Sequence, residues 1–331
     1  VRGDEYKRLT PVYDWMKIPG ATIVQLDKMP GENEIQKWGL TDYVGAVTDG
    51  TYGAVGLDFK SPHTGLAAKK VWFFFDKTYV CLGTDISSRM KNQVLTTVNQ
   101  CLLNGQVTVS DADGIHPQER GSRMKKGVRW VVHDRVGYYF LNKENVILSN
   151  QRTEGSWKIA NRQTTTPTDI IQQDVFTLSV DHGSYPNNEG YAYMVVPSAD
   201  PLSIEKQVEE EGVVVLANCP DVQAVRHDGL NMAYAVFYKG GTLRIHDKIV
   251  VEMDAPGMLM VKYNDAGEIL TLGVSDPTRF MKKLHLSVNQ RIVGTAQENI
   301  QTEWDGKQAL TRITVELPQN EYAGKSVIYN K

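Results

Sequence analysis

Three His-Asp dipeptides are the first residues in the chain whose types could support acid–base chemistry. They are His133-Asp134, His227-Asp228 and His246-Asp247. A carboxylate that orients an imidazole is a common arrangement for a general base. Sequence neighbours on a strand, however, point to opposite faces of a sheet. We therefore interpret all three as strand-end or turn pairs, and we predict no catalytic role for them.

Other familiar catalytic and metal-binding patterns are missing or incomplete. No Gly-x-Ser-x-Gly elbow, phosphate-binding loop or dinucleotide fingerprint occurs in the sequence. The tetrapeptide Asp111-Ala112-Asp113-Gly114 begins like a calcium loop, with oxygen ligands two residues apart. The EF-hand pattern then fails, because its third Asp or Asn, its Gly and its final Glu do not follow. We predict a β-turn here and no metal or other cofactor, with calcium at this loop as the alternative.

Binding is better supported than catalysis, because two tryptophans lie outside the strand patterns. Trp38 is in a polar stretch, and Trp15 is flanked by Pro11 and Pro19. A loop Trp is costly to expose unless something stacks on its ring, and sugar rings are natural partners. We predict that Trp38, and with it Trp15, contacts a sugar. The alternative for Trp38 is packing beneath its loop, and the alternative for Trp15 is that it anchors its segment to the sheet or to another domain.

A basic stretch from residue 118 to 127 carries Arg120, Arg123, Lys125 and Lys126. These charges would complement sulfate or carboxylate groups, so we predict substrate contacts for Arg120 and Arg123. The alternative is an ordinary solvated hairpin loop.

Composition limits the other classes of function. The chain has 331 residues, 36 basic and 39 acidic side chains and a net charge of −3, so no bulk field favours nucleic acid or a membrane. No apolar run reaches the roughly 20 residues of a membrane helix. The first residues show neither a signal segment nor an initiator Met, which is typical of a fragment or a processed product. We interpret Cys81, Cys101 and Cys219 as buried free thiols.

The hydrophobic pattern predicts an all-β protein. Short β-branched and aromatic runs recur between turn residues, and the only helical candidate is residues 202–210. Short connections favour antiparallel pairing, with a hairpin over 128–141 that turns near Asp134-Arg135. A Pro-Gly break after the long strand near residue 250 predicts two domains, a large one over 1–253 and a small one over 254–331.

Several strings together resemble the β-sheet half of the family 8 polysaccharide lyases, which include chondroitin, hyaluronan and xanthan lyases. The resemblance covers essentially the whole chain. It is carried by Lys70-x-Trp72-Phe73-x-Phe75, Val80-x-Leu82-Gly83-x-x-Ile86, Thr96-Thr97-Val98-x-Gln100, His182-Gly183-x-x-Pro186, Tyr191-Ala192-Tyr193-x-x-x-Pro197, the run from Val222 to His227, and Ser275-Asp276-Pro277-Thr278.

The resemblance implies a large antiparallel super-sandwich domain followed by a smaller C-terminal β-sandwich, both preceded in the family by an α/α toroid that this chain lacks. It also implies that the Asn, His, Tyr and Arg of the active site lie on that toroid, with a Glu just upstream of residue 1. Glu5 is the carboxylate nearest to that position, but it falls downstream of it in a predicted Gly-Asp-Glu-Tyr turn. Glu5 is the one catalytic candidate, and we expect the chain alone to be inactive.

The main hypothesis is therefore the C-terminal β portion of a bacterial lyase, exported to the periplasm or the medium, that cleaves acidic polysaccharide of the chondroitin or hyaluronan type by β-elimination. Its expected partners are that polysaccharide and the upstream toroid. One alternative is a stand-alone carbohydrate-binding β-sandwich. Another, a hydrolase with an unfamiliar carboxylate pair, has no pair of residues to support it.

Overall fold

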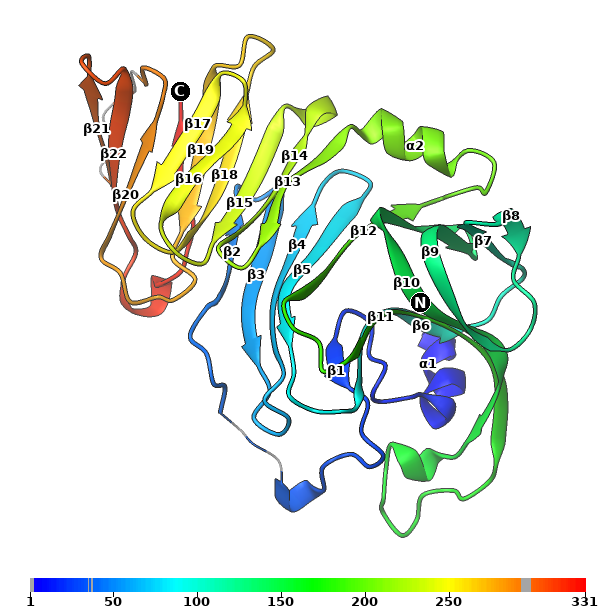
Figure 1. Cartoon of the computed structure of the whole chain (residues 1–331). Helices are drawn as coiled ribbons and strands as arrows, with labels where there is room; N and C mark the ends of the chain where they lie inside the picture. The colour runs from blue at the N-terminus through cyan, green and yellow to red at the C-terminus, as the bar shows by residue number, and fades with distance from the viewer. Residues whose placement is uncertain (1–2, 35, 37, 293–298) are drawn as a thin grey trace. The chain divides into compact units, whose positions relative to one another are not determined.

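The computed structural model describes residues 3–34, 36, 38–292 and 299–331, and the chain forms two units that are each densely packed (Figure 1). The first unit consists of 1–37, 62–66 and 86–204, and the second of 38–61, 67–85 and 205–331. Every strand pair whose register is described is antiparallel. The predicted all-β class is thus confirmed.

The first unit contains a sheet with the hydrogen-bonded order β1-β6-β11-β10-β12, while β9 pairs with both β10 and β7, and β7 pairs with β8. Its elements are α1 Gly3–Leu9, η1 Thr10–Val12, β1 Thr22–Val24, η2 Glu32–Glu34, β6 Gln93–Leu102, β7 Val107–Asp111, β8 Gly114–Pro117, β9 Ser122–His133, β10 Val136–Gly155, η3 Trp157–Ile159, β11 Ile171–Ser184 and β12 Glu189–Pro197.

The hairpin between β9 and β10 turns where the sequence predicts it. Asp134 and Arg135 both have positive φ, 47° and 62°. Two such residues between antiparallel strands are typical of a tight turn whose twist matches that of the strands. β10 then runs to Gly155, well beyond the predicted end at Leu141, and its register with β9 shifts on either side of Glu144. Bulges of this kind let one long strand bend.

The second unit stacks three sheets: β5-β4-β3-β2, the six-stranded β13-β14-β15-β18-β19-β23 and the five-stranded β16-β17-β20-β22-β21. Its elements are β2 Val44–Thr48, β3 Gly53–Lys60, β4 Ala67–Phe74, β5 Tyr79–Ser87, α2 Ile204–Glu211, β13 Val213–Cys219, β14 Val222–His227, η4 Asp228–Leu230, β15 Met232–Phe237, β16 Gly241–His246, β17 Ile249–Met253, β18 Gly257–Tyr263, β19 Ile269–Ser275, β20 Lys283–Val288, β21 Ile300–Asp305, β22 Leu310–Glu316, η5 Asn320–Tyr322 and β23 Val327–Asn330.

The central strands of the six-stranded sheet, β15 and β18, are buried on both faces. One face carries Phe237 and Leu259 into a core shared with Val251 and Leu286 of the five-stranded sheet. On the other face, a Cβ at Gly56 of β3 would lie only 3.0 Å from Val236 of β15. Strands buried on both sides read as nearly continuous apolar runs, which explains the sequence of β15 and β18.

Two local predictions are wrong. The Gly-Asp-Glu-Tyr stretch is not a turn but the first turns of α1, with Asp4 and Glu5 near the positive end of the helix dipole. The basic stretch 118–127 is not a single loop, because β9 already begins at Ser122. The prediction of a helix over 202–210 is confirmed by α2.

Neither α-helix within the described ranges is long and apolar enough to cross a bilayer. The boundary predicted between residues 253 and 254 stays a prediction.

Candidate functional site

The first unit holds a groove of about 230 Å³ beside the segment that contains Trp15, and we call it the Trp15 groove. Its floor comes from neighbouring strands of the sheet, and one wall comes from residues 12–17. Its lining residues are Val12, Asp14, Lys17, Gln100, Ser122, Ile147, Ser149, Gln151, Thr153, Val175, Thr177 and Ser179.

A row of polar side chains crosses the floor of this groove. Thr177 of β11 is paired with Gln100 of β6 on one side and with Ser149 of β10 on the other. Ser149 is in turn paired with Ser122 of β9. Directly paired residues present their side chains on the same face of a sheet, so one amide and three hydroxyls form a line across four strands. Such a line can both donate and accept hydrogen bonds.

Gln100 fixes the wall to the floor. Its Oε1 accepts a hydrogen bond from the backbone N of Asp14 at 2.8 Å, and its Nε2 donates to the carbonyls of Asp14 and Lys17 at 3.0 and 2.8 Å. Close packing supports the same segment, because a Cβ at Gly155 would lie 2.0 Å from the carbonyl oxygen of Pro11. The chain around Trp15 is therefore held close to β6 and β10.

The groove offers binding groups and lacks a free acid–base pair. Its only ionisable lining side chains, among those the structure describes, are Asp14 and Lys17. They form an ion pair with a 2.8 Å contact between Oδ2 and Nζ. General acid–base catalysis needs a group that can give or take a proton at the reacting atoms. The Trp15 groove is thus suited to hold a polyhydroxylated ligand rather than to cleave it.

The two predicted sugar-contacting tryptophans are both exposed. Trp38 lies in the bend before β2 with 84% of its surface exposed, so its ring does not pack beneath the loop. Trp15 is 38% exposed, and its ring makes an edge contact with Tyr13 at 5.0 Å between centroids. Trp38 falls in the second unit and Trp15 in the first. Their role in sugar binding stays a prediction.

The two predicted arginines lie on the other face of the sheet from the Trp15 groove. Arg120 donates to Oδ1 of Asp174 at 2.6 Å, and Asp174 precedes Val175, which lines the groove. Arg123 follows Ser122, another lining residue, and pairs with Glu119 at 2.5 Å. Since successive residues on a strand alternate in direction, Arg123 and Asp174 point away from the floor of the groove, and Arg120 is bound to Asp174 on that other face.

Glu5 belongs to a different cavity, of about 400 Å³, which it lines together with Arg8 of α1 and Asp134 of the β9–β10 turn. Beside this cavity, Sγ of Cys101 lies 3.7 Å from Nδ1 of His133. Burial, followed by the charges of Glu5 and Asp134, raises the pKa of the Cys101 thiol to about 12. Burial also lowers the pKa of His133. A neutral thiol beside a neutral imidazole is not an activated nucleophile.

The remaining sequence candidates have structural roles. His133, His227 and His246 are each the last residue of their strand, as predicted. Asp111 is paired with Gly114 across the tight β7–β8 turn, and its carboxylate accepts from Lys125 at 2.9 Å. Burial raises the pKa of Asp111, but hydrogen bonds from Lys125, from the His116 ring and from the turn amide of Asp113 together hold it below its usual value. Within the described ranges no cluster of metal-ligating residues occurs, and the cofactor prediction stays a prediction.

All three cysteines are free, as predicted, but only Cys81 is buried; Cys101 and Cys219 are partly exposed.

One carboxyl that the sequence did not single out has an unusual proton affinity. Burial raises the pKa of Glu144 to about 7, with the charge of Glu189 acting in the same direction and a hydrogen bond from the Ala192 backbone opposing it. Glu144 sits between the two register shifts of β10. The local sequence around it is polar and indicates a surface turn, so no sequence signal identifies this residue.

Comparison with known proteins agrees with this organisation. Residues 1–208 match the family described as polysaccharide lyase family 8, super-sandwich domain, and residues 214–285 match the family 8 C-terminal beta-sandwich domain. The fold and these two matches define a lyase super-sandwich followed by a smaller β-sandwich. The chain belongs to polysaccharide lyase family 8, which confirms the resemblance drawn from the sequence.

Individual relatives match most of this chain and extend well beyond it. The chain is 35% identical to the chondroitinase-AC of Pedobacter heparinus over 332 residues, which is 99% of this chain and 44% of the relative. It is 27% identical to a xanthan lyase of Bacillus sp., over 81% of this chain and 29% of that protein. A solved chondroitinase AC lyase structure matches with a TM-score of 0.83 over 99% of this chain and 45% of its own. The chain thus spans less than half the length of these relatives.

Proposed function

We propose that this chain is the recognition portion of a polysaccharide lyase that cleaves uronic-acid-containing glycosaminoglycan of the chondroitin or hyaluronan type by β-elimination. In this account it forms one wall of the substrate cleft. The reaction requires neutralising the sugar carboxylate, removing the C5 proton and protonating the leaving oxygen. An α/α toroid upstream in the same protein supplies those groups, and the 331-residue chain alone is inactive.

The observation that carries the proposal is the chemistry of the Trp15 groove. Its floor presents neutral hydroxyl and amide groups, and the only two charges in it cancel each other within the Asp14–Lys17 pair. An acidic sugar polymer can therefore lie on this floor without meeting an unpaired carboxylate. Trp15 would add a stacking surface beside the groove. We propose Trp38 in the second unit, and Arg120 and Arg123 on the other face of the sheet, as sugar contacts outside the groove.

An apolar surface in the second unit supports the proposed partner domain. Val44, Val55 and Phe74 lie on one face of the β2-β3-β4 sheet and are 56%, 37% and 43% exposed. Contiguous exposed apolar side chains of this kind mark interaction surfaces. We propose that the toroid covers them, and that the whole protein is exported to the bacterial periplasm or the medium, where its polymeric substrate occurs.

A binding measurement tests the recognition role. Replacing Thr177→Val and Ser149→Ala removes two hydroxyls from the floor while keeping its shape. Each lost hydrogen bond costs about 0.5–1.5 kcal/mol, so the double variant should bind a chondroitin tetrasaccharide about tenfold more weakly in calorimetry. The matched control is Thr164→Val, which removes an exposed hydroxyl in the same unit. Equal affinities in all three proteins would contradict the proposal.

The stand-alone carbohydrate-binding module remains the alternative. It would bind the tetrasaccharide in the same way, and it is distinguished by the upstream sequence, which should then lack several hundred helical residues.

A further inference from the structure

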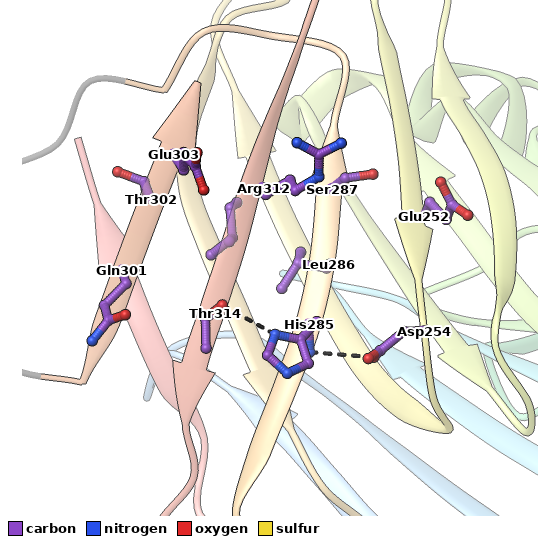
Figure 2. A pocket seen from close by; sticks show the side chains of 11 residues that line it. Glu252, Asp254, His285, Leu286, Ser287, Gln301, Thr302, Glu303, Arg312 and Thr314 are labelled. Carbon is purple, nitrogen blue, oxygen red and sulfur yellow. Dashed lines mark hydrogen bonds between the residues drawn. The ribbon is translucent and has the colours of Figure 1, made fainter. Parts of the chain in front are cut away.

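The five-stranded sheet of the second unit carries a groove of about 460 Å³ on its outer face, and we call it the C-terminal groove (Figure 2). Strand alternation produces it. Val251, Leu286 and Ile313 turn mainly inward to the core, while their sequence neighbours turn outward. The volume is in the range of small-molecule sites.

Two rows of side chains cross this face. The first runs through directly paired residues, Glu252 of β17 to Ser287 of β20, Ser287 to Arg312 of β22, and Arg312 to Glu303 of β21. Because strands in a sheet lie about 4.8 Å apart, the row is about 14 Å long. This is an extended groove rather than a single point of contact.

The second row runs parallel to the first and is pre-ordered by hydrogen bonds. His285 is paired with Thr314, which is paired with Gln301. Nδ1 of His285 lies 3.0 Å from Oγ1 of Thr314, and the backbone N of His285 donates to Oδ1 of Asp254 at 3.2 Å (Figure 2). Asp254, His285 and Thr314 are therefore held in place before any ligand arrives.

Charge decides what such a groove accepts. Glu252, Asp254 and Glu303 bring three carboxylates, and Arg312 brings the one guanidinium. Arg312 is already committed, because Nη1 donates to Asp305 at 2.9 Å and Nη2 to Gln308 at 2.6 Å. A sulfated or carboxylated sugar would meet like charge here. An uncharged sugar would find carboxylate, hydroxyl and amide acceptors for its hydroxyl groups, with Leu286 and Ile313 in the lining for its C–H faces.

We propose that the C-terminal groove binds an uncharged sugar unit, at a site built from different residues than the Trp15 groove and with the opposite preference for charge. The occupant is a neutral oligosaccharide and not the acidic polymer of the proposed reaction. The groove would thus attach the protein to a neutral glycan.

The test is a titration of the 331-residue chain followed by the amide resonances of residues 285–287 and 312–314. The probes are chitotetraose, cellotetraose, a chondroitin tetrasaccharide, calcium chloride and a lysine-rich peptide. We expect at least one neutral tetrasaccharide to shift these resonances with a dissociation constant on the order of 1 mM. Glu252→Ala combined with Thr314→Val should weaken that binding about tenfold.

Glu316→Gln is the matched control, since Glu316 lies further along the outer face of β22, pairs with Lys283 and does not line the groove. It should leave the affinity unchanged, and thermal unfolding should show all variants folded. The proposal is overturned if no neutral tetrasaccharide shifts these resonances, or if Glu316→Gln weakens binding as much as the groove variant. Tighter binding of the chondroitin tetrasaccharide, calcium or the lysine-rich peptide would also overturn it. This test measures binding at the C-terminal groove alone, so its result is independent of the function proposed for the Trp15 groove.

Discussion

The Trp15 groove and the C-terminal groove share one construction, in which a row of polar side chains crosses four antiparallel strands. In the first, the row is made of neutral side chains, among them Gln100, Thr177 and Ser149. The segment that Gln100 binds forms one wall of this groove. In the second, Glu252 and Glu303 end the row with carboxylates. Register brings such groups together in both cases, and we propose that the charge of a few side chains then sets which glycan each groove accepts.

The largest effect should come from removing the clamp of the Trp15 groove. Gln100→Ala deletes three hydrogen bonds to the backbone of Asp14 and Lys17. At 0.5–1.5 kcal/mol each, the loss should be about 2–4 kcal/mol in urea unfolding, together with loss of tetrasaccharide binding. Gln151→Ala, at an exposed position of the same groove, should change stability by less than about 0.5 kcal/mol. Similar losses for the two variants would show that the clamp is not the source of the effect.

The pH dependence of stability should differ between the first unit and the second. The pKa of Glu144 in the first unit is raised from 4.5 to about 7 by burial, so the folded state holds a proton that the unfolded state has lost. Stability should therefore fall as pH rises from about 4.5 to 7, by at most about 3 kcal/mol. Glu144→Gln should flatten this part of the unfolding profile, and an unchanged slope would refute the assignment.

The six-stranded and five-stranded sheets of the second unit should instead lose stability as the pH falls. Hydrogen bonds from Asn264 and Lys331 lower the pKa of Glu268, and those from Gln308 and Arg312 lower the pKa of Asp305. Groups with a lowered pKa contribute stability above their unfolded pKa, and that contribution is lost as pH falls through the folded value. As the pH is lowered, amide hydrogen exchange should increase first in β21 and β22.

Gly155→Ala should disrupt the packing of β10 against the segment that forms one wall of the Trp15 groove. The new Cβ would meet the carbonyl oxygen of Pro11 at 2.0 Å, and a backbone atom cannot swing away as a side chain does. Overpacking of this kind costs about 1–3 kcal/mol. Gly241→Ala, where nothing lies within 4 Å of the new Cβ, is the control. The expected readout is a lower unfolding midpoint for Gly155→Ala alone.

The smallest expected effect is a change of preference in the C-terminal groove. Glu252→Lys with Glu303→Lys turns two of its three carboxylates into ammonium groups. The variant should bind a chondroitin tetrasaccharide about tenfold more tightly than the parent groove does, measured on the same amide resonances. If the parent and the variant prefer the same oligosaccharide, charge does not set the specificity.

The fold class and some of the local elements could be predicted from the sequence. Local signals were enough for the Asp134-Arg135 turn and for α2, because a tight turn and a short amphipathic helix depend on adjacent residues. Local signals failed for α1, because Gly3 and Asp4 are typical of a turn. They also failed for the start of β9 at Ser122, because its charged residues are not typical of a strand. Glycines and charges are weak local evidence when long-range pairing decides the structure.

The grooves could not be predicted in the same way. Gln100, Thr177 and Ser149 are far apart in the chain and become neighbours only through the order of β6, β11 and β10. In the five-stranded sheet, Glu303 and Arg312 belong to one hairpin, but Glu252 joins their row only through the order of β17, β20 and β22. Trp38 was predicted to lie in a loop from the polar residues around it, and its exposure rules out the alternative that its ring packs beneath that loop. Arg120 and Arg123 were predicted from charge, which carries no information about the face of a sheet.

The most direct test of the proposed division of labour is ultraviolet detection of unsaturated uronate ends. The purified 331-residue chain and the same chain with its upstream region restored are each incubated with chondroitin sulfate and with hyaluronan. Product from the longer protein alone is the predicted result, because we propose that the acid, the base and the carboxylate-neutralising group lie upstream. Turnover by the 331-residue chain would contradict the account and direct attention to Glu5 and the His-Asp pairs.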